Sequence, residues 1–281
     1  MTNLKELLKK DLTEAELEKA PNSFEVIGSK EKSVAIVEIP EELESKKKLI
    51  AKKIMQMNKG VKSVLKKSSE RKGEFRTREF ELIAGDEDTK VLHREYGYLL
   101  KVDPQIVYFS EKEGVERQRI AEQVRPNEVV MVMFAGIGSF CVAIVKKQPL
   151  VEKIIAIELN PQAARYIVEN SLINRIADKI VAIEGDVKEE AKRFYGRCNR
   201  VVMPLPLEAS EFFDDAIKCL RESGIIHFYT IINQNDFSSA EKTIKEVCTR
   251  MNRKYKILNE HKVTAYSPRK WKVVIDILVE K

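Results

Sequence analysis

The sequence predicts an α/β protein whose main part is a doubly wound, seven-stranded, largely parallel sheet, with a smaller amino-terminal α+β domain. Two observations carry this prediction. An apolar run at 129–133 ends in the turn Phe-Ala-Gly-Ile-Gly at 134–138, and strand-like and helix-like segments alternate from about residue 118. Helices that alternate with strands usually connect parallel strands, and ligands bind at the carboxyl ends of such strands. We therefore expect one domain at 1–117 and a second at 118–281.

In the first domain, helical spacing of leucines predicts a helix over residues 1–20, and Glu41–Lys59 is typical of another. Alternating apolar residues predict two short strands within 24–39 and further strands at 61–65, 80–82 and 96–102. In the second domain, strands are expected at 129–133, 154–158, 179–183, 199–203 and 224–229, followed by two more at 254–262 and 271–279. Helices are expected at 138–146, 161–173, 187–195, 208–221 and 237–252.

Composition narrows the class of protein. With 43% hydrophobic and 33% charged residues, the chain of 281 residues is expected to be globular. The first six residues lead into no apolar segment, so no signal peptide is expected. The stretch 129–145 carries no charge and has a membrane helix as its alternative, but Gly136, Gly138 and Ser139 interrupt it. The four cysteines and three histidines lack metal-ligand spacing, so no metal site is expected.

Positive charge is concentrated in one segment. Residues 46–78 hold 13 lysines and arginines but only two acids, Glu70 and Glu74, while the whole chain is only +6. A concentrated basic region beside a nearly neutral body favours a polyanionic partner, nucleic acid first. The alternative is a solvated basic helix in a lysine-rich protein.

The strand ends predict a nucleoside-binding pocket. Gly136 and Gly138 allow a sharp turn and close approach of a ligand to the main chain. Glu158 follows Gly138 by 20 residues and can accept hydrogen bonds from ribose hydroxyls. Asp186 could bind an adenine, with a helix cap as its alternative. Cys141 stands where a dinucleotide motif has its last glycine, so S-adenosylmethionine fits better than a dinucleotide.

Seven strands with a hairpin-like final pair resemble class I methyltransferases. A series of motifs makes the resemblance more specific, including Glu-Arg (116–117), Phe-Ala-Gly-Ile-Gly (134–138), Ala-Ile-Glu-Leu-Asn-Pro (156–161), Gly-Asp (185–186), Leu-Pro (205–206) and Tyr-Ser-Pro (266–268). In this order they resemble the archaeal and eukaryotic tRNA (guanine-37-N1) methyltransferase family, whose close relatives make wyosine derivatives at the same position. The family often carries an extra amino-terminal domain, and this chain is expected not to contain all of it.

The resemblance implies roles for individual residues. Glu116 matches the general base that removes the proton from guanine N1, and a partly buried carboxylate is a suitable acceptor. Arg76 matches the arginine that steadies guanine O6, and Tyr108 an aromatic residue that helps to place the flipped base. From its residues alone, Glu116 would be an exposed acid. The implied S-adenosylmethionine site comprises Phe134, Ala135, Gly136, Gly138, Glu158, Leu159, Asn160, Asp186, Val187 and Pro204.

The chain departs from the family at several motif positions. Val132 replaces an aspartate, Pro204 replaces an asparagine, and Glu111-Lys112 replaces Pro-Arg. The resemblance implies an S-adenosylmethionine-dependent enzyme acting on the anticodon stem-loop of tRNA, expected to be a cytoplasmic monomer that binds neither DNA nor membrane. Pro204 keeps a wyosine-pathway reaction open, either carbon methylation or aminocarboxypropyl transfer. Val132 and Pro204 together keep a non-catalytic tRNA-binding paralogue open.

Overall fold

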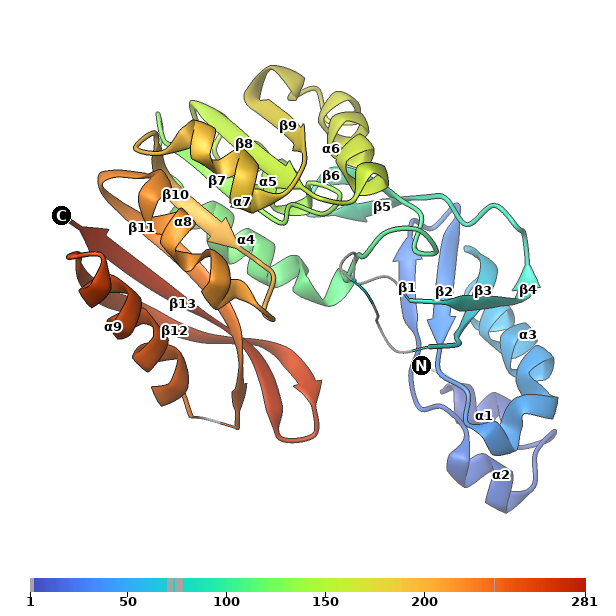
Figure 1. Cartoon of the computed structure of the whole chain (residues 1–281). Helices are drawn as coiled ribbons and strands as arrows, with labels where there is room; N and C mark the ends of the chain where they lie inside the picture. The colour runs from blue at the N-terminus through green and yellow to red at the C-terminus, as the bar shows by residue number, and fades with distance from the viewer. Residues whose placement is uncertain (1–2, 70–72, 74–77, 235) are drawn as a thin grey trace. The chain divides into compact units, whose positions relative to one another are not determined.

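The computed structural model describes residues 3–69, 73, 78–234 and 236–281. The chain divides into two compact units, 1–111 and 112–281, which are coloured along the chain in Figure 1. The sequence placed the boundary after residue 117, a position inside helix α4 (Gly114–Gln123). The structural division lies earlier because α4 packs against α5 (Ser139–Lys147) of the second unit.

The first unit is built on a four-stranded sheet in the order β1-β2-β3-β4. The middle strands β2 and β3 are parallel, and the outer pairs are antiparallel. Its elements are α1 (Leu4–Leu8), α2 (Glu14–Lys19), β1 (Glu25–Gly28), β2 (Ser33–Val37), η1 (Glu41–Lys46), α3 (Lys47–Met57), β3 (Val61–Lys67) and β4 (Phe80–Gly85). Helix α3 connects the parallel pair and buries Ile50, Ala51 and Ile54 in the core of this unit.

Two expectations for this unit were wrong in detail. Two short helices, Leu4–Leu8 and Glu14–Lys19, stand where one was expected over 1–20, because Thr13 caps the second helix and accepts a hydrogen bond from the backbone N–H of Glu16. The strand expected at 96–102 begins at Tyr98, because Tyr96 and Gly97 form a tight hairpin turn with φ of 40° and 84°. That turn joins β6 (Tyr98–Val102) to β5 (Val91–Glu95), a strand that was not expected.

The second unit contains a seven-stranded sheet in the order β12-β13-β11-β10-β7-β8-β9. All neighbouring pairs are parallel except those that involve β13, which runs antiparallel to β11 and β12. The strands are β7 (Val129–Met133), β8 (Lys153–Glu158), β9 (Ile180–Glu184), β10 (Cys198–Met203), β11 (Leu220–Asn233), β12 (Lys254–Ser267) and β13 (Lys270–Glu280). The order reverses between β7 and β10, which is where doubly wound sheets bind ligands. The expected doubly wound class with a smaller first domain is confirmed.

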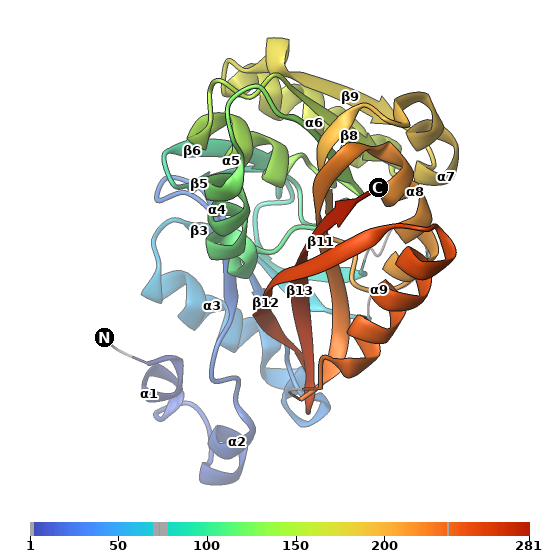
Figure 2. The ribbon, with the colours of Figure 1, turned by 90° about the vertical axis from the view of Figure 1, so that its left-hand side faces the viewer.

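Helices cover both faces of this sheet. In Figure 2, α4 and α5 lie on one side of β11 and β13, and α8 and α9 lie on the other. The helices are α4, α5, α6 (Pro161–Ile173), η3 (Ala177–Lys179), α7 (Val187–Glu190), η4 (Ala191–Phe194), η5 (Ala209–Phe212), α8 (Phe213–Cys219) and α9 (Ser238–Arg250). Helix α4 was not expected, and 187–195 and 208–221 each combine a short α-helix with a 3-10 turn.

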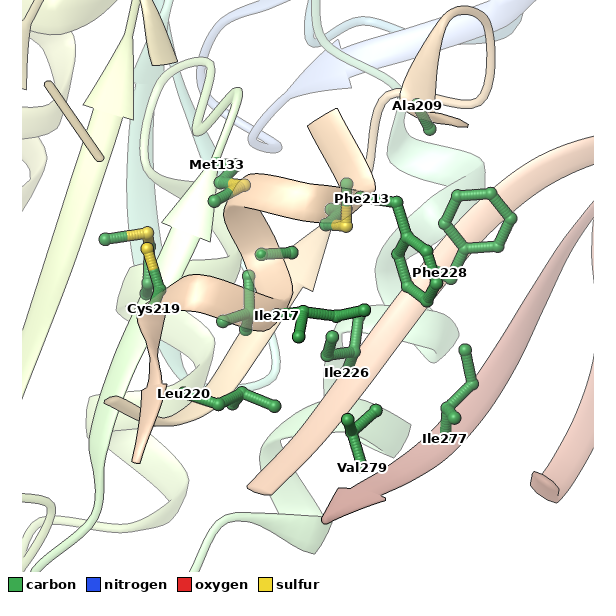
Figure 3. Packing of buried hydrophobic residues seen from close by; sticks show 14 of the residues in the cluster. Met133, Ala209, Phe213, Ile217, Cys219, Leu220, Ile226, Phe228, Ile277 and Val279 are labelled. Carbon is green, nitrogen blue, oxygen red and sulfur yellow. The ribbon is translucent and has the colours of Figure 1, made fainter. Parts of the chain in front are cut away.

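The face covered by α7, α8 and α9 is apolar. Phe213 of α8 packs on Phe228 of β11 with ring centroids 4.9 Å apart, and Ile226 and Ile277 lie beside them (Figure 3). The opposite face also buries apolar residues of β7 and β8, but on β10, β11 and β13 it carries the buried polar side chains Arg200, His227 and Asp276.

Candidate active site

The turn after β7 has an unusual backbone. Phe134, Gly136 and Gly138 all have positive φ, at 56°, 56° and 77°. A Cβ atom added at Gly138 would lie 3.2 Å from the Ile167 side chain, so this glycine allows α5 to pack closely on α6. A Cβ atom added at Gly136 would meet nothing within 4 Å. Gly136 therefore leaves open space at the carboxyl end of the strand.

Glu158 is the last residue of β8, and its carboxylate links the loop after β7 to the loop after β8. Its Oε2 accepts the backbone N–H of Gly136 at 2.7 Å, and its Oε1 accepts that of Asn160 at 2.9 Å. Burial raises the pKa of Glu158, while hydrogen bonds from the Asn160, Gly136 and Leu159 backbone oppose that rise. Each carboxylate oxygen has a second lone pair for a ligand hydroxyl.

The remaining residues of the predicted pocket have mixed roles. Asn160 caps α6, and its side chain accepts the N–H groups of Gln162 and Ala163. Asp186 is exposed and caps α7 through Lys188 N–H at 2.8 Å, so the helix-cap alternative describes its contacts in this structure. Ala135 is buried and donates its N–H to Ile157, Leu159 is half-buried, and Val187 is part of the apolar core.

Aromatic and basic side chains surround the turn. The Phe134 ring meets Phe212 edge-to-face at 4.8 Å between centroids. The Lys188 ammonium lies 5.0 Å from the Phe212 ring. Pro204, which follows β10, is half-buried. Val132 is fully buried within β7, two residues before Phe134. The position at which the family has an aspartate is therefore inaccessible to solvent in this chain.

The strand register places these groups at one edge. Four residues are register partners across β8, β7, β10 and β11: Ala156, Val132, Val202 and His227. Two residues further along the same strands stand Glu158, Phe134, Pro204 and Tyr229. Because these strands are parallel, this second row forms the carboxyl edge of the sheet. Tyr229 links the edge to α5, since its ring meets that of Phe140 edge-to-face at 6.1 Å.

Glu116 contacts this edge from helix α4. Its side chain is only 3% exposed, in contrast to the exposed acid that its surrounding residues indicate. Tyr229 donates its hydroxyl to Glu116 Oε1 at 2.5 Å. Arg119, one helical turn along, binds both carboxylate oxygens, through Nε at 2.7 Å and Nη2 at 2.9 Å. Glu116 is therefore a buried, fixed carboxylate at the edge that carries the predicted pocket.

The hydrogen bonds continue along the sheet beneath α4. Arg119 also binds Asp276 of β13, through Nη1 at 2.6 Å and Nη2 at 3.1 Å. Asp276 contacts His227 Nδ1 at 2.6 Å, and His227 Nε2 contacts Arg200 Nη1 at 2.7 Å. Arg200 then pairs with Glu128 through Nε at 2.8 Å. We call this chain from Tyr229 to Glu128 the α4 network.

The protonation state of His227 follows from its partners. Arginine has only donors, so the Nε2 that faces Arg200 must accept, and Nδ1 carries the proton that is donated to Asp276. Burial lowers the pKa of His227, although the Asp276 carboxylate opposes this. Burial alone would raise the pKa of Asp276, but hydrogen bonds from His227 and Arg119 outweigh it and hold the pKa well below its usual range.

These directions predict how stability depends on pH. His227 stays neutral in the folded state, whereas an unfolded histidine takes up a proton below about pH 6.5. Stability should therefore be full above that pH and fall as the pH decreases, by up to about 1.4 kcal/mol per unit from this group. The Asp276 contribution should be lost only below about pH 4. Urea unfolding at a series of pH values measures this dependence. It can be followed by the fluorescence of Trp271, which is the sole tryptophan and lies on β13, the strand of Asp276. The slope between about pH 6.5 and 5 should decrease in His227→Gln, and an unchanged slope would contradict the assignment.

Two predicted residues cannot be joined to this site. Arg76 lies outside the described residues. Tyr108 is half-buried and belongs to the unit 1–111, whereas Glu116 belongs to the unit 112–281. The roles of Arg76 and Tyr108 stay predictions.

The basic segment is partly neutralised by acids from outside it. Lys66 pairs with Glu44 and, at 3.7 Å, with Glu81. Lys53 pairs with Asp11 at 2.7 Å, and Lys67 with Glu25 at 3.3 Å. By contrast, four other lysines among the segment's described residues are exposed: Lys48, Lys52, Lys59 and Lys62, the last of which donates to the Lys59 carbonyl. The net positive charge at the surface of the described part of this segment is therefore smaller than the number of its lysines and arginines indicates.

Most residues of the α4 network were not predicted from the sequence. Arg119, Tyr229 and Asp276 were not singled out, and the histidines were considered only as metal ligands. One signal was available, since Asp276 interrupts the apolar run Val273–Val279 and His227 interrupts Ile225–Phe228. A charged residue inside a buried strand needs a partner, which predicts a polar network.

The described residues contain neither a candidate metal site nor a candidate membrane helix. No group of three or more histidine, cysteine, aspartate or glutamate side chains among them could hold a metal ion. Within the same residues, no helix has the length and apolar character needed to cross a membrane.

Comparisons with known proteins agree with this geometry. Residues 91–258 match the family described as TRM5/TYW2 methyltransferase domain, and residues 4–89 match the TYW2 N-terminal domain. The chain is 38% identical to the tRNA (guanine(37)-N(1))-methyltransferase Trm5b of Pyrococcus abyssi, over 92% of this chain and 75% of that protein. It is 31% identical to the tRNA(Phe) (4-demethylwyosine(37)-C(7)) aminocarboxypropyltransferase of Pyrococcus horikoshii, over 99% and 96%.

A solved structure of aTrm5 with tRNALeu shares the fold, with a TM-score of 0.86 and 35% identity over all of this chain and 78% of that one. The family match covers more than half of the chain, and the identities extend over both units. The chain therefore belongs to the TRM5/TYW2 methyltransferase family.

Proposed function

We propose that this protein transfers the methyl group of S-adenosylmethionine to N1 of guanosine 37 in tRNA. The observation that carries the proposal is Glu116, a buried carboxylate fixed at the edge of the sheet that carries the Gly136–Glu158 pocket. Membership in a methyltransferase family supports the reaction type. The Pyrococcus abyssi relative, whose name specifies guanine 37 N1, supports the target.

The pocket fits the adenosyl part of this methyl donor. Space beside Gly136 lets a ligand approach the main chain, and the spare lone pairs of Glu158 suit ribose hydroxyls. Asp186 and the half-buried Leu159 stand at neighbouring strand ends. When bound, S-adenosylmethionine supplies an electrophilic methyl group on a sulfonium, so that alignment is the main requirement for transfer.

Glu116 performs the proton transfer in this proposal. Guanine N1 carries a proton at neutral pH and is a poor nucleophile until the proton leaves. The Glu116 carboxylate accepts it, and the N1 lone pair becomes available for the new bond to carbon. The base must leave its stack in the anticodon loop to reach a buried side chain, so the target is expected in a loop rather than in a paired stem.

Methyl transfer to a tRNA transcript tests the target. With S-adenosylmethionine labelled in its methyl group, a transcript with guanosine 37 should take up one label, and the same transcript with adenosine 37 should take up none. Equal labelling of both would place the methyl group elsewhere and reject the proposed target.

A wyosine-pathway reaction is the second candidate. The match of residues 4–89 to the TYW2 N-terminal domain favours it, as does Pro204 in place of the family's asparagine. The position of the label separates the two. Label in the methyl group should reach unmodified tRNA under the first proposal. Label in the aminocarboxypropyl group should reach only tRNA that already carries a tricyclic base under the second. Methyl label on the tricyclic base alone would indicate carbon methylation.

Three exposed lysines of the basic segment, Lys48, Lys52 and Lys59, should contribute to RNA affinity. Replacing Lys48, Lys52 and Lys59 together with alanine should weaken tRNA binding and flatten its dependence on salt, because each phosphate contact contributes about 0.7–0.9 to the slope. The matched triple variant changes Lys53, Lys66 and Lys67, which are occupied by Asp11, Glu44, Glu81 and Glu25. Compared with the first triple variant, it should lower thermal stability more and change the dependence of tRNA affinity on salt less. Filter binding at several salt concentrations measures both, and identical slopes would contradict the assignment.

A further inference from the structure

Arg119 lies between two buried carboxylates. Its Nε and Nη2 bind Glu116, and its Nη1 and Nη2 bind Asp276, which is 2% exposed. We propose that Asp276 is a positioning residue that shares Arg119 with Glu116 and so keeps Glu116 an effective proton acceptor. This inference rests on the proposed role of Glu116 as the general base.

The need for a second carboxylate follows from electrostatics. A guanidinium in two-point contact with a carboxylate stabilises its charged form and makes it a weaker base. A general base buried beside an arginine would then accept a proton from guanine N1 only reluctantly. A second negative charge on the same guanidinium offsets part of this stabilisation, because charges interact strongly in a site that excludes water.

The geometry also fixes where Arg119 points. Asp276 is itself held by His227 Nδ1–H, and Gln123 of α4 donates to Asp276 Oδ2 at 3.2 Å. The Asp276 carboxylate is therefore held by His227 of β11 and Gln123 of α4 independently of its contact with Arg119. Arg119 is in turn held in the orientation that presents Nε and Nη2 to Glu116.

Several ionisable groups surround Glu116, and their states determine how a pH profile can be interpreted. Arg119, Tyr229 of β11 and His261 of β12 are next to Glu116 itself, Asp276 of β13 is joined to it through Arg119, and Lys272 of β13, paired with Glu113, lies over the Tyr229 ring. Burial and the Glu116 charge raise the pKa of Tyr229 well above its ordinary value, so it stays protonated near neutral pH. His261 has a half-exposed side chain, and its Nε2 lies 3.8 Å from Glu116 Oε2. It is therefore the neighbour that needs a control.

The test is the pH dependence of single-turnover methyl transfer at saturating enzyme and S-adenosylmethionine. Asp276→Asn keeps the shape of the side chain and removes its charge, so Arg119 acts on Glu116 alone. The acid limb of the profile should move to lower pH by about one unit, the low end of the range for a nearby charge, and the plateau rate should fall. Arg119→Gln should move the limb in the opposite direction.

Glu128→Gln is the matched control. It removes a carboxylate paired with an arginine in the same network, but its partner is Arg200, which does not contact Glu116. It should cost stability in thermal unfolding and leave the acid limb in place. His261→Asn should also leave the limb in place, which assigns the limb to Glu116. If Arg119→Gln fails to fold, Asp276→Asn and Glu128→Gln still decide the question.

The outcomes separate this inference from the proposed function. A limb that moves down in Asp276→Asn and stays in Glu128→Gln supports the shared arginine. A limb that is unchanged or moves up in folded Asp276→Asn overturns it, even if Glu116→Gln is inactive and the base assignment stands. Full activity of Glu116→Gln overturns the base assignment and this inference with it, whereas the proposed function is overturned only if the wild-type protein transfers no methyl group to guanosine 37.

Discussion

Glu116→Gln is expected to lower the single-turnover rate of methyl transfer about 10²–10⁴-fold, the usual contribution of a general base. Glutamine keeps the shape of the side chain, and its oxygen in the place of Oε1 can still accept hydrogen bonds from Tyr229 and from Arg119 Nη2. It is a far weaker proton acceptor, so N1 of the target guanine keeps its proton. Binding of tRNA and S-adenosylhomocysteine should stay near the wild-type values.

The control for this variant is Glu128→Gln, because both changes remove a negative charge from an ion pair of the same network in which one partner is buried and the other partly buried. Glu128→Gln should transfer methyl groups at close to the wild-type rate. Rapid-quench measurements with saturating enzyme compare the two. Equal rates for both variants would make Glu116 a structural residue.

Gly136→Val is expected to abolish detectable binding of S-adenosylhomocysteine in calorimetric titration. The added side chain would occupy the space that the Gly136 backbone leaves open beside Glu158. It would also be strained at φ of 56°, with a cost of about 1–3 kcal/mol. Strain alone could weaken binding by destabilising the turn, so a variant with equal strain elsewhere is needed.

Gly196 provides that control within the same unit. Its φ is 69°, a Cβ atom added there also meets nothing within 4 Å, and it precedes β10 at the amino edge of the sheet. Gly196→Val should therefore lose a similar amount of stability and bind S-adenosylhomocysteine normally. Similar affinities in Gly136→Val and Gly196→Val would reject the pocket assignment.

The sequence was sufficient where an element buries an apolar face and has clear boundaries. The bounds of β7 agree with the prediction because an uncharged run of β-formers ends at a glycine turn. Those of α6 agree because Asn160 caps it and Pro161 begins it. The edge residues Glu158 and Gly136 were likewise predictable, since they follow these strands and the topology brings parallel strand ends together.

Helix α4 could not be found in the same way. The residues that it buries include Glu116 and Arg117, while Val115 is 69% exposed. Its buried face combines the apolar Ile120 and Ala121 with an ion pair to β13 and a hydrogen bond from a tyrosine of β11. Apolar periodicity therefore indicates neither the helix nor its orientation. The partners of Glu116 also come from strands far along the chain, which a local pattern does not reveal.

The nature of the product tests the central claim most directly. A tRNA transcript with guanosine 37 is incubated with the full chain and S-adenosylmethionine, digested to nucleosides, and analysed by chromatography and mass spectrometry. We predict that one guanosine per tRNA becomes N1-methylguanosine and that sequencing of fragments places it at position 37. Unchanged guanosine 37 in this transcript would contradict the proposal. Addition of an aminocarboxypropyl or methyl group to a second tRNA that already carries a tricyclic base at position 37 would then establish the wyosine-pathway reaction.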